Sequence, residues 1–165
     1  GDAVTRGPRG QRRLEPARAL GAPALPLKVE ICSGDGEWVC SQALADARRA
    51  NWACVELRRD RIFRTLARAF LLGVSNLCFI AGDAAVMLEH LAPRSLACVF
   101  INFPEPPVRR GGADNAGSPQ LITVATLKLV CRALAPRGTL LVLSDNLAYL
   151  RQIAGMVSTA GGFGP

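Results

Sequence analysis

The chain has 165 residues, of which 50% are hydrophobic and 20% are charged, and its formal net charge at pH 7 is +7. This composition argues against a disordered chain, and the length suits one domain with a sizeable core. No apolar run approaches the ~20 residues of a membrane-spanning helix, and no signal-peptide pattern opens the chain, so we expect a cytosolic or nuclear protein.

Residues 1–26 are predicted to be a flexible basic N-terminal segment. They include Pro8, Pro16, Pro23 and Pro26, and they show no sustained hydrophobic periodicity. Residues 1–28 carry +4 of the net charge, which suits contact with the phosphates of a nucleic acid. A solubilising tail would have the same composition.

From Leu27 onward, short apolar runs alternate with longer segments of helical periodicity. Strands are predicted at 27–32, 52–57, 77–81, 96–102 and 138–144. Helices are predicted at 37–50, 60–73, 83–91, 119–134 and 146–160. We therefore expect residues 27–165 to form one domain.

The helix predicted at 60–73 is amphipathic. Its apolar face is expected to consist of Ile62, Phe63, Leu66, Ala69 and Phe70, with Arg61, Arg64 and Arg68 largely outside that face. Gly73 is well placed to end this helix.

Strands without alternation are typically buried on both faces, and here a helix follows each strand. This order predicts a doubly wound α/β fold with a mostly parallel sheet, built by right-handed crossovers. In such folds, ligands bind beyond the carboxyl ends of the strands, near the point where the strand order reverses.

The cysteines do not have the spacing of a metal site. Cys32, Cys40, Cys54, Cys78, Cys98 and Cys131 include no CxxC-type pair, and His90 is the only histidine. Cys54, Cys78 and Cys98 fall inside predicted strands, where a thiol behaves as a small core hydrophobe. We expect buried free thiols and no metal.

An acidic residue stands at or just after the end of each of the first four predicted strands: Glu30, Glu56, Asp83 and Glu105. Because the carboxyl ends of parallel strands share one edge of the sheet, we expect these acids around one pocket. Glu56 can accept hydrogen bonds from both ribose hydroxyls of a nucleoside. Taken singly, Glu56 could equally pair with Arg58 or Arg59, and Asp83 could simply cap a helix.

The first strand runs into "EICSGDGEW" (30–38), where Gly34 and Gly36 allow a tight turn and a close approach of a ligand to the backbone. An ordinary β-to-α turn has the same pattern. The chain lacks the GxxxxGK(S/T) motif of a P-loop, and Val39 stands where a dinucleotide-binding motif has its third glycine. A nucleoside ligand without a pyrophosphate, such as S-adenosylmethionine, fits these features.

Five segments together resemble the tRNA (guanine-N7)-methyltransferases of the TrmB type, over roughly residues 29–150. They are "VEICSGDGEW", "CVELRRDRI", "NLCFIAGDAAVML", "VFINFPEPP" and "LAPRGTLLVLSDNLAYL". The glycine turn is common to class I methyltransferases, whereas the INFP-acid-P segment after the fourth strand is far more specific. The resemblance implies a Rossmann-like class I methyltransferase fold.

The resemblance also implies roles for individual residues. S-adenosylmethionine would be held by Glu30, Gly34, Gly36, Glu56, Asp83, Ala84, Asn102 and Phe103. The catalytic edge would include Asn102 and Glu105, and the tRNA substrate would be bound by Arg109 and Asp145. Prolines on both sides of Glu105 would restrict this loop and so organise it in advance.

The implied reaction forms 7-methylguanosine in tRNA. Guanine N7 carries no proton, so the enzyme mainly has to align it with the sulfonium methyl group. Eukaryotic members of the family work with a WD-repeat protein, and the arginine face of the helix at 60–73 is a candidate docking surface. A solvated face would show the same pattern.

The chain departs from the family pattern at Cys32, where a glycine is usual, and at Glu105, where an aspartate is usual. The basic run after the motif is reduced to Arg109 and Arg110. We also expect the domain to lack the last two strands, either because it is truncated at its C-terminus or because the protein is a reduced version of the fold. Two alternatives stay open: a class I methyltransferase with another substrate, and a non-catalytic cofactor-binding or scaffold relative.

Overall fold

The computed structural model describes residues 4–6, 12–106 and 120–164. Its centre is a five-stranded sheet made of β3 (Leu27–Ile31), β4 (Asn51–Glu56), β5 (Leu77–Ala81), β6 (Leu96–Asn102) and β7 (Leu134–Leu143). The spatial order is β5-β4-β3-β6-β7, and every neighbouring pair is parallel. The chain thus winds outward from β3 in both directions, which confirms the predicted doubly wound fold and puts the reversal of strand order between β3 and β6.

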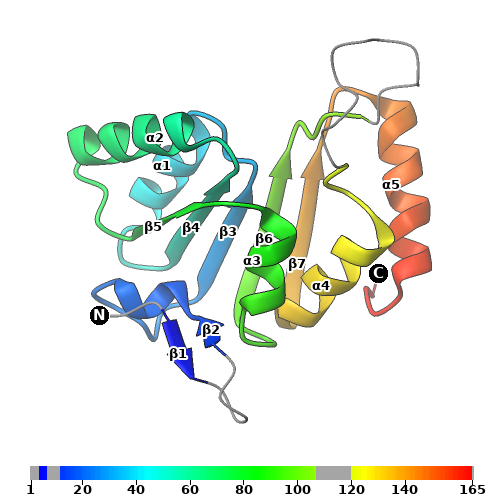
Figure 1. Ribbon diagram of the computed structural model, residues 1–165, viewed down its shortest axis with the longest axis horizontal. Coiled ribbons are helices and arrows are strands. Elements are labelled where there is room, and N and C mark those ends of the chain that lie inside the picture. Colours follow the sequence, from blue (N-terminus) through cyan, green and yellow to red (C-terminus); the bar gives the residue numbers. More distant parts are fainter. Residues whose placement is uncertain (1–3, 7–11, 107–119, 165) are drawn as a thin grey trace.

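Helices cover the sheet on both sides (Figure 1). They are α1 (Glu37–Ala45), α2 (Arg59–Leu72), α3 (Ala84–His90), α4 (Val124–Ala133) and α5 (Leu147–Ala160). The α1 and α2 helices pack over β4 and β5, whereas α3, α4 and α5 pack against one another on the other side. No helix of the described residues is long and apolar enough to cross a membrane.

Side chains on the two faces of the central strands pack into two separate hydrophobic cores. Val29 and Ile31 of β3 belong to the core under α3, α4 and α5. Trp52 and Cys54 of β4 belong to the core under α1 and α2. Every residue of β4 is buried, as expected for a central strand whose apolar run shows no alternation.

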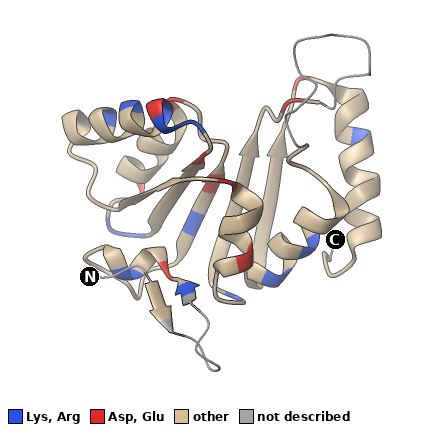
Figure 2. Ribbon diagram, in the orientation of Figure 1, with Lys and Arg blue, Asp and Glu red and all other residues tan. Residues whose placement is uncertain are grey.

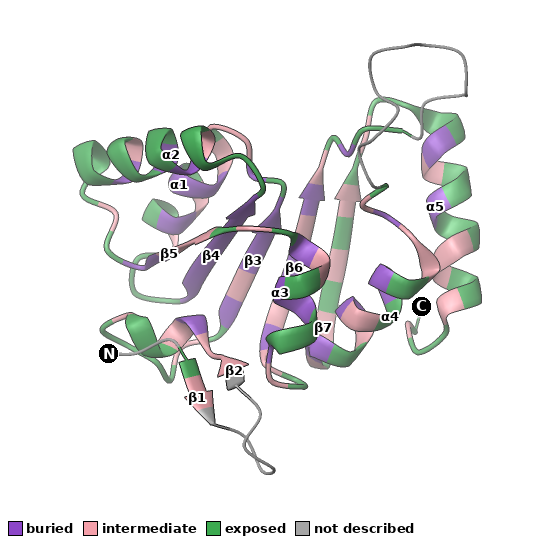
Figure 3. Cartoon of the chain, in the orientation of Figure 1, coloured by how far each residue is buried: buried purple, intermediate pink, exposed green. Residues whose placement is uncertain are grey.

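The edge strand β7 is covered on one face only (Figure 3). Leu141 and Leu143 are exposed, whereas Leu140 and Val142, which alternate with them along the strand, are half-buried. The sequence analysis expected strands such as "GTLLVLS" to be buried on both faces, and for β7 this is wrong. The reason is that α1 and α2 pack over the β4–β5 side of the sheet and do not reach β7.

The predicted apolar face of α2 is also wrong in part. Ile62 and Ala69 are buried as expected, but Phe63, Leu66 and Phe70 are exposed. The third buried position of the helix is the polar Thr65, because α2 lies against the glycine turn at that point. Gly73 ends the helix in a left-handed conformation with φ +70°, as predicted.

Several element boundaries differ from the expected ones. The α1 helix ends at Ala45 rather than at residue 50. The α4 helix begins at Val124 rather than at residue 119, because the Thr123 side chain accepts a hydrogen bond from the Thr126 N–H and caps it there. The β7 strand begins earlier than expected, at Leu134, with an irregular register against β6.

Short elements precede the sheet, where the sequence analysis assigned none. The β1 strand (Val4–Arg6) pairs antiparallel with β2 (Arg12–Leu14), and the short 3-10 helix η1 (Pro16–Ala19) follows. Leu14 forms an isolated bridge with Leu91 and packs against the larger core. Flexibility of residues 1–26, and a domain boundary after residue 26, stay predictions.

All six cysteines are free thiols. Cys54 and Cys98 are buried as predicted, and so is Cys40 of α1, whereas Cys78 and Cys131 are half-buried and Cys32 is exposed. The buried thiols pack as small core residues, but the expectation of buried thiols is wrong for Cys32.

Candidate active site

The turn after β3 is held in a left-handed conformation. Gly34 has φ +57° and Gly36 has φ +75°, values that glycine adopts without steric cost. The Ser33 N–H donates to the Val55 carbonyl (3.1 Å), which ties the turn to the end of β4. A Cβ atom at Gly36 would lie 2.2 Å from Thr65 Cγ2, so α2 contacts the turn directly at this position.

Glu56, at the end of β4, has a donor on each of its carboxylate oxygens. Its Oε2 accepts from the Gly34 N–H (3.1 Å), and its Oε1 accepts from the Arg58 N–H (3.0 Å). The Arg61 guanidinium adds an ion pair, with Nη1 3.9 Å from Oε2. The side chain is only 6% exposed, so its rotamer is fixed at the edge of the sheet.

Glu30, near the end of β3, lies in a different environment. It is 3% exposed, and its Oε1 accepts a hydrogen bond from Asn102 Nδ2 at the end of β6 (2.8 Å). Its buried Oε2 has no partner among the described residues. Burial raises the pKa of the Glu30 carboxyl to about 7, against the lowering effect of the Asn102 hydrogen bond.

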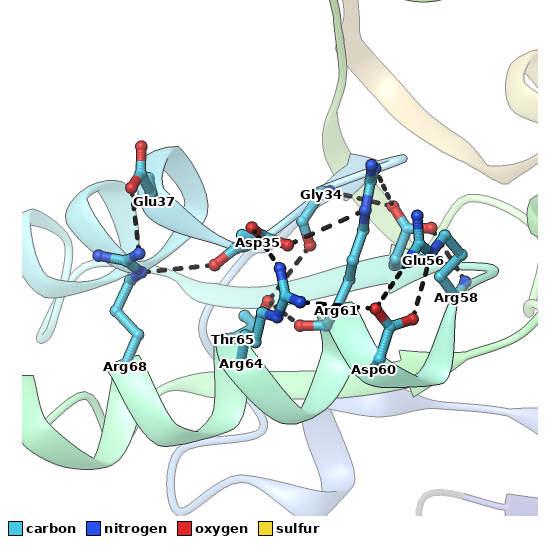
Figure 4. Close-up of polar contacts among 10 residues, drawn as sticks. All are labelled: Gly34, Asp35, Glu37, Glu56, Arg58, Asp60, Arg61, Arg64, Thr65 and Arg68. Atoms are coloured by element: carbon cyan, nitrogen blue, oxygen red, sulfur yellow. Dashed lines mark hydrogen bonds and ion pairs between the residues drawn. The ribbon is translucent and has the colours of Figure 1, made fainter.

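Charged side chains of α2 extend from Glu56 along the glycine turn (Figure 4). Arg61 and Arg64 both pair with Asp35, at 3.9 and 3.1 Å. Further along, Arg68 pairs with Glu37 (3.1 Å). Arg64, Arg68 and their acidic partners are partly exposed, so each pair contributes little to stability, but together they hold the turn against the helix.

The four acids predicted from the strand ends all affect the charge of one residue, Cys32, which directly follows β3 and has a left-handed conformation with φ +58°. Although Cys32 is exposed, partial burial is the largest cause that raises the pKa of its thiol, to about 11. The negative charges of Glu56, Glu105, Asp83 and Glu30, in that order, raise it further. Figure 2 shows acidic positions at the ends of the central strands.

Asp83 caps a helix, which is one of the two roles that the sequence predicted for it. It is the N-cap of α3, and its carboxylate accepts a hydrogen bond from the Ala85 N–H (2.7 Å). Ala84, the first residue of α3, is buried beneath it. Asp83 itself is exposed, so it remains accessible to a ligand at the edge of the sheet.

The segment after β6 turns away from the sheet at Phe103, which has φ +49° and is exposed. Its N–H donates to the Leu143 carbonyl at the end of β7 (2.7 Å), which fixes the turn. Pro104 is buried and Glu105 is exposed. The structure therefore presents the Glu105 carboxylate to solvent, on a backbone anchored by the residues before it.

Of the two predicted substrate-binding residues, only Asp145 lies in the part of the chain that the structure describes. Asp145 is exposed in the short connection between β7 and α5, next to Asn146, whose side chain caps α5 by accepting from the Tyr149 N–H (3.0 Å). It is therefore at the carboxyl edge of the sheet, but no described contact joins it to the other site residues. Arg109 lies outside the described residues, as does Arg110.

Two residues at the site were not predicted. Thr65 is fully buried, packs on Gly36, and donates from Oγ1 to the Arg61 carbonyl (3.0 Å). Arg61 pairs with both Glu56 and Asp35. A polar residue at a buried helical spacing between Ile62 and Ala69 was the available signal for Thr65, and nothing in the sequence distinguishes Arg61 from Arg64.

This edge of the sheet can hold a nucleoside. This edge holds a fixed carboxylate that suits ribose hydroxyls, a glycine turn that allows close backbone approach, and a buried carboxyl that has no cationic partner among the described residues. The fold and this arrangement define the Rossmann-like class I methyltransferases.

Comparison with known proteins gives the family. The chain belongs to the family described as "Putative methyltransferase", which it matches over residues 24–163. The family-level resemblance inferred from the sequence is thereby confirmed.

Curated relatives carry a more specific name. The tRNA (guanine-N(7)-)-methyltransferase of Chlamydia felis is 31% identical over 128 residues, which are 77% of this chain and 55% of that protein. The protein of the same name from Rubrobacter xylanophilus is 27% identical over 136 residues, 82% of this chain and 59% of that protein. The chain thus spans about half the length of the curated relatives it matches.

Among solved structures, a SAM-dependent methyltransferase from Aquifex aeolicus superposes with a TM-score of 0.61. The match covers 82% of this chain and 71% of that one, at 11% sequence identity. At that identity the likeness supports the fold alone.

Proposed function

We propose that this chain is the cofactor-binding and catalytic core of an S-adenosylmethionine-dependent methyltransferase that forms 7-methylguanosine in tRNA. The observation that carries the proposal is the position of the Glu56 carboxylate, which the Gly34 and Arg58 N–H groups fix at the end of β4. The names of the curated relatives support guanine N7 of tRNA as the methyl acceptor.

The residues present fit the cofactor. Glu56 uses one lone pair on each oxygen for a backbone N–H, which leaves acceptor capacity for two ribose hydroxyls. Glu30 has a buried oxygen that no described residue contacts by a hydrogen bond, and it would suit the cationic amino-acid end of the ligand. Gly34, Gly36, Asp83, Ala84, Asn102 and Phe103 would complete the binding site.

Bound S-adenosylmethionine would supply a sulfonium methyl group, which the lone pair of guanine N7 takes up as the neutral thioether leaves. Because N7 carries no proton, no side chain needs to act as a general base. Glu105 would instead hold the N1–H and amino group of the guanine. Its charge would also stabilise the positive charge that develops on the ring. Asn102 is aligned for its role by its hydrogen bond to Glu30.

The tRNA is proposed to bind across the carboxyl edge of the sheet. Asp145 lies at this edge, and Arg109 and Arg110 follow Glu105 in sequence, where their charges would meet phosphate. The base has to leave its stack to reach the methyl group. Such a substrate suits the expected cytoplasmic or nuclear location.

A WD-repeat subunit stays a prediction. The arginine face of α2 is engaged within the chain, since Arg64 pairs with Asp35 and Arg68 with Glu37. A partner docking there would have to compete with these ion pairs or use the charges that remain exposed.

The test has two stages. Calorimetry with S-adenosylmethionine should show binding to the 165-residue chain, and an unmodified tRNA transcript should then gain 7-methylguanosine, detected by mass spectrometry of its nucleosides. Glu105→Ala should reduce the rate at least ~10-fold. Glu89→Ala, at an exposed position of α3, is the matched control and should leave the rate unchanged.

Each stage can overturn a different part of the proposal. Absence of cofactor binding would favour a non-catalytic relative. Binding followed by methylation of another nucleoside or molecule would identify a methyltransferase with another substrate. An unchanged rate in Glu105→Ala would remove Glu105 from the active site even if tRNA is the substrate.

A further inference from the structure

The α2 helix carries apolar side chains on two of its sides. One side packs on the sheet through Ile62, Thr65 and Ala69. The other side faces solvent and forms a continuous stripe of Phe63, Leu66, Ala67, Phe70 and Leu71, here called the α2 stripe. Figure 3 shows the outward side of α2 as exposed along most of its length.

The exposure of this stripe is large for a single helix. Phe63 is 67% exposed, and Phe70 and Leu71 are each 83% exposed. With Leu66, these side chains leave roughly 500 Å² of apolar surface in water, which is within the range of the largest patch on a typical monomer. Phe63 and Phe70 are seven residues apart, about two helical turns, so both rings lie on the same side of the helix, and exposed phenylalanines do not make a surface more soluble.

The stripe has the spacing of a helix–helix contact. Arg59, Phe63, Leu66, Phe70 and Gly73 follow one another at intervals of four, three, four and three residues. Intervals of this kind place side chains along one seam of a helix that packs against a second helix. The arginines of the network in Figure 4 lie beside the seam and have acidic partners within the chain.

We propose that the α2 stripe is a dimer interface, in which the α2 helices of two copies of this chain pack antiparallel about a twofold axis. The axis passes between Leu66 and Ala67. This register places Phe63 against Phe70 of the second copy, and Leu66 against Ala67 of the second copy. Each aromatic ring meets another ring, and the larger side chain near the axis meets the smaller one.

Charge supports the antiparallel direction. Arg59, at the N-terminal end of the seam, is exposed and has no ion pair among the residues described. In the antiparallel pair it reaches the C-terminal end of the other α2, at Gly73. The last carbonyl groups of a helix carry a partial negative charge, so a guanidinium there is favourable. A parallel pair would instead bring the two Arg59 residues together.

The area is sufficient for a specific dimer. Complete burial of the stripe on both copies, together with the flanking Arg59, removes about 1,200 Å² of surface from water, the lower limit of the range for specific interfaces. The N-terminus of α2 lies beside Glu56, so the antiparallel pair puts the two candidate sites at opposite ends of the interface. The proposal does not depend on the proposed reaction.

The first test is sedimentation of the wild-type chain over a concentration series up to ~100 µM. We expect a species with twice the 17.5 kDa mass of one chain. Phe70→Glu should raise the dimer dissociation constant at least ~30-fold, because the change acts twice across the twofold axis. Val86→Glu, at an exposed apolar position of α3 on the other side of the sheet, is the matched control and should leave the dimer unchanged.

The register is tested by a pair of variants. Phe63→Glu and Phe70→Lys should each be monomeric alone, whereas an equimolar mixture should form a heterodimer with one Glu–Lys pair and one Phe–Phe pair. Circular dichroism confirms that each variant is folded. A wild-type chain that stays monomeric would overturn the proposal, as would a dimer that Phe70→Glu leaves intact. Failure of the mixture to associate would overturn the antiparallel register.

Discussion

Glu30 and Glu56 lie at the ends of adjacent strands, and both are almost fully buried. Their carboxylates nevertheless have very different hydrogen-bond partners. Glu56 receives a backbone N–H on each oxygen and an arginine nearby. Glu30 receives one side-chain amide, and its other oxygen has no partner among the described residues. Burial therefore raises the pKa of Glu30 to about 7.

The difference follows from where each residue lies relative to the glycine turn. The turn leaves β3 and passes beside the end of β4, where the Gly34 N–H donates to Glu56 and the Ser33 N–H donates to the Val55 carbonyl. Glu30 lies one strand further in, beside β6. One carboxylate is thus organised in advance to accept hydrogen bonds, and the other has no cationic partner among the residues that the structure describes.

The largest expected effect is on the pH dependence of stability. Burial raises the pKa of Glu30 in the folded state to about 7 from its ordinary value of 4.5, so the folded state binds this proton more tightly than the unfolded state. Stability is fully present below the unfolded pKa and falls by about 3 kcal/mol as the pH rises through 7. Glu30→Gln should remove that loss, and urea unfolding of both proteins at pH 4.5 and pH 8 measures it.

Other groups titrate in the same range, so the measured quantity is the difference between the variant and the wild type. Glu89→Gln, at an exposed position of α3, controls for the loss of one negative charge. Suppose that the free energies of unfolding of Glu30→Gln and of the wild type differ by the same amount at both pH values. In that case burial does not destabilise the charged Glu30 carboxylate, and the contrast with Glu56 disappears.

The second effect is smaller and has the opposite sign. Glu56→Gln should destabilise the fold by about 2 kcal/mol at pH 8, because the new amide group turns its own N–H toward either the Gly34 or the Arg58 N–H. Glu30→Gln should stabilise the fold at the same pH. Urea unfolding of the two variants side by side tests the comparison, and two shifts of equal sign would contradict it.

Much of the fold could be predicted from the sequence because the strands are short apolar runs that a Gly- or Asp-containing turn ends. The extent of β5 and β6 was predicted to the residue. The buried face of α2 could not be predicted, since apolar residues cover more than half of the helix. Only the contact between Thr65 and the glycine turn decides which side faces the sheet. The exposed face of β7 depends in the same way on where α1 and α2 pack.

The part of the site that follows from the order and direction of the strands could be predicted. Parallel strands bring their carboxyl ends to one edge, so Glu30, Glu56, Asp83 and Glu105 were expected together, and the charges of all four raise the pKa of the Cys32 thiol. The hydrogen bond between Glu30 and Asn102 could not be derived, because it depends on β3 and β6 being neighbours although 72 residues separate the pair. The ion pair between Arg61 and Glu56 depends on the rotation of α2, which the sequence leaves open.

The smallest effect concerns the turn that separates the two carboxylates. Gly34 and Gly36 both have positive φ, so an alanine at either position should cost about 1 kcal/mol of backbone strain. Nothing lies within 4 Å of a Cβ at Gly34, whereas a Cβ at Gly36 would overlap Thr65 Cγ2, Oγ1 and Cβ at 2.2 to 2.7 Å. Gly36→Ala should therefore cost at least ~1 kcal/mol more than Gly34→Ala in urea unfolding.

The comparison of these two glycines isolates the contact, because the backbone term is shared and only the overlap with Thr65 differs. Thr65 is fully buried and branched at Cβ, so it cannot move aside as a long side chain would. Equal costs for the two variants would mean that α2 can shift away from the turn. The donor at Gly34 would then be less firmly placed, and the distinction between Glu56 and Glu30 would rest on burial alone.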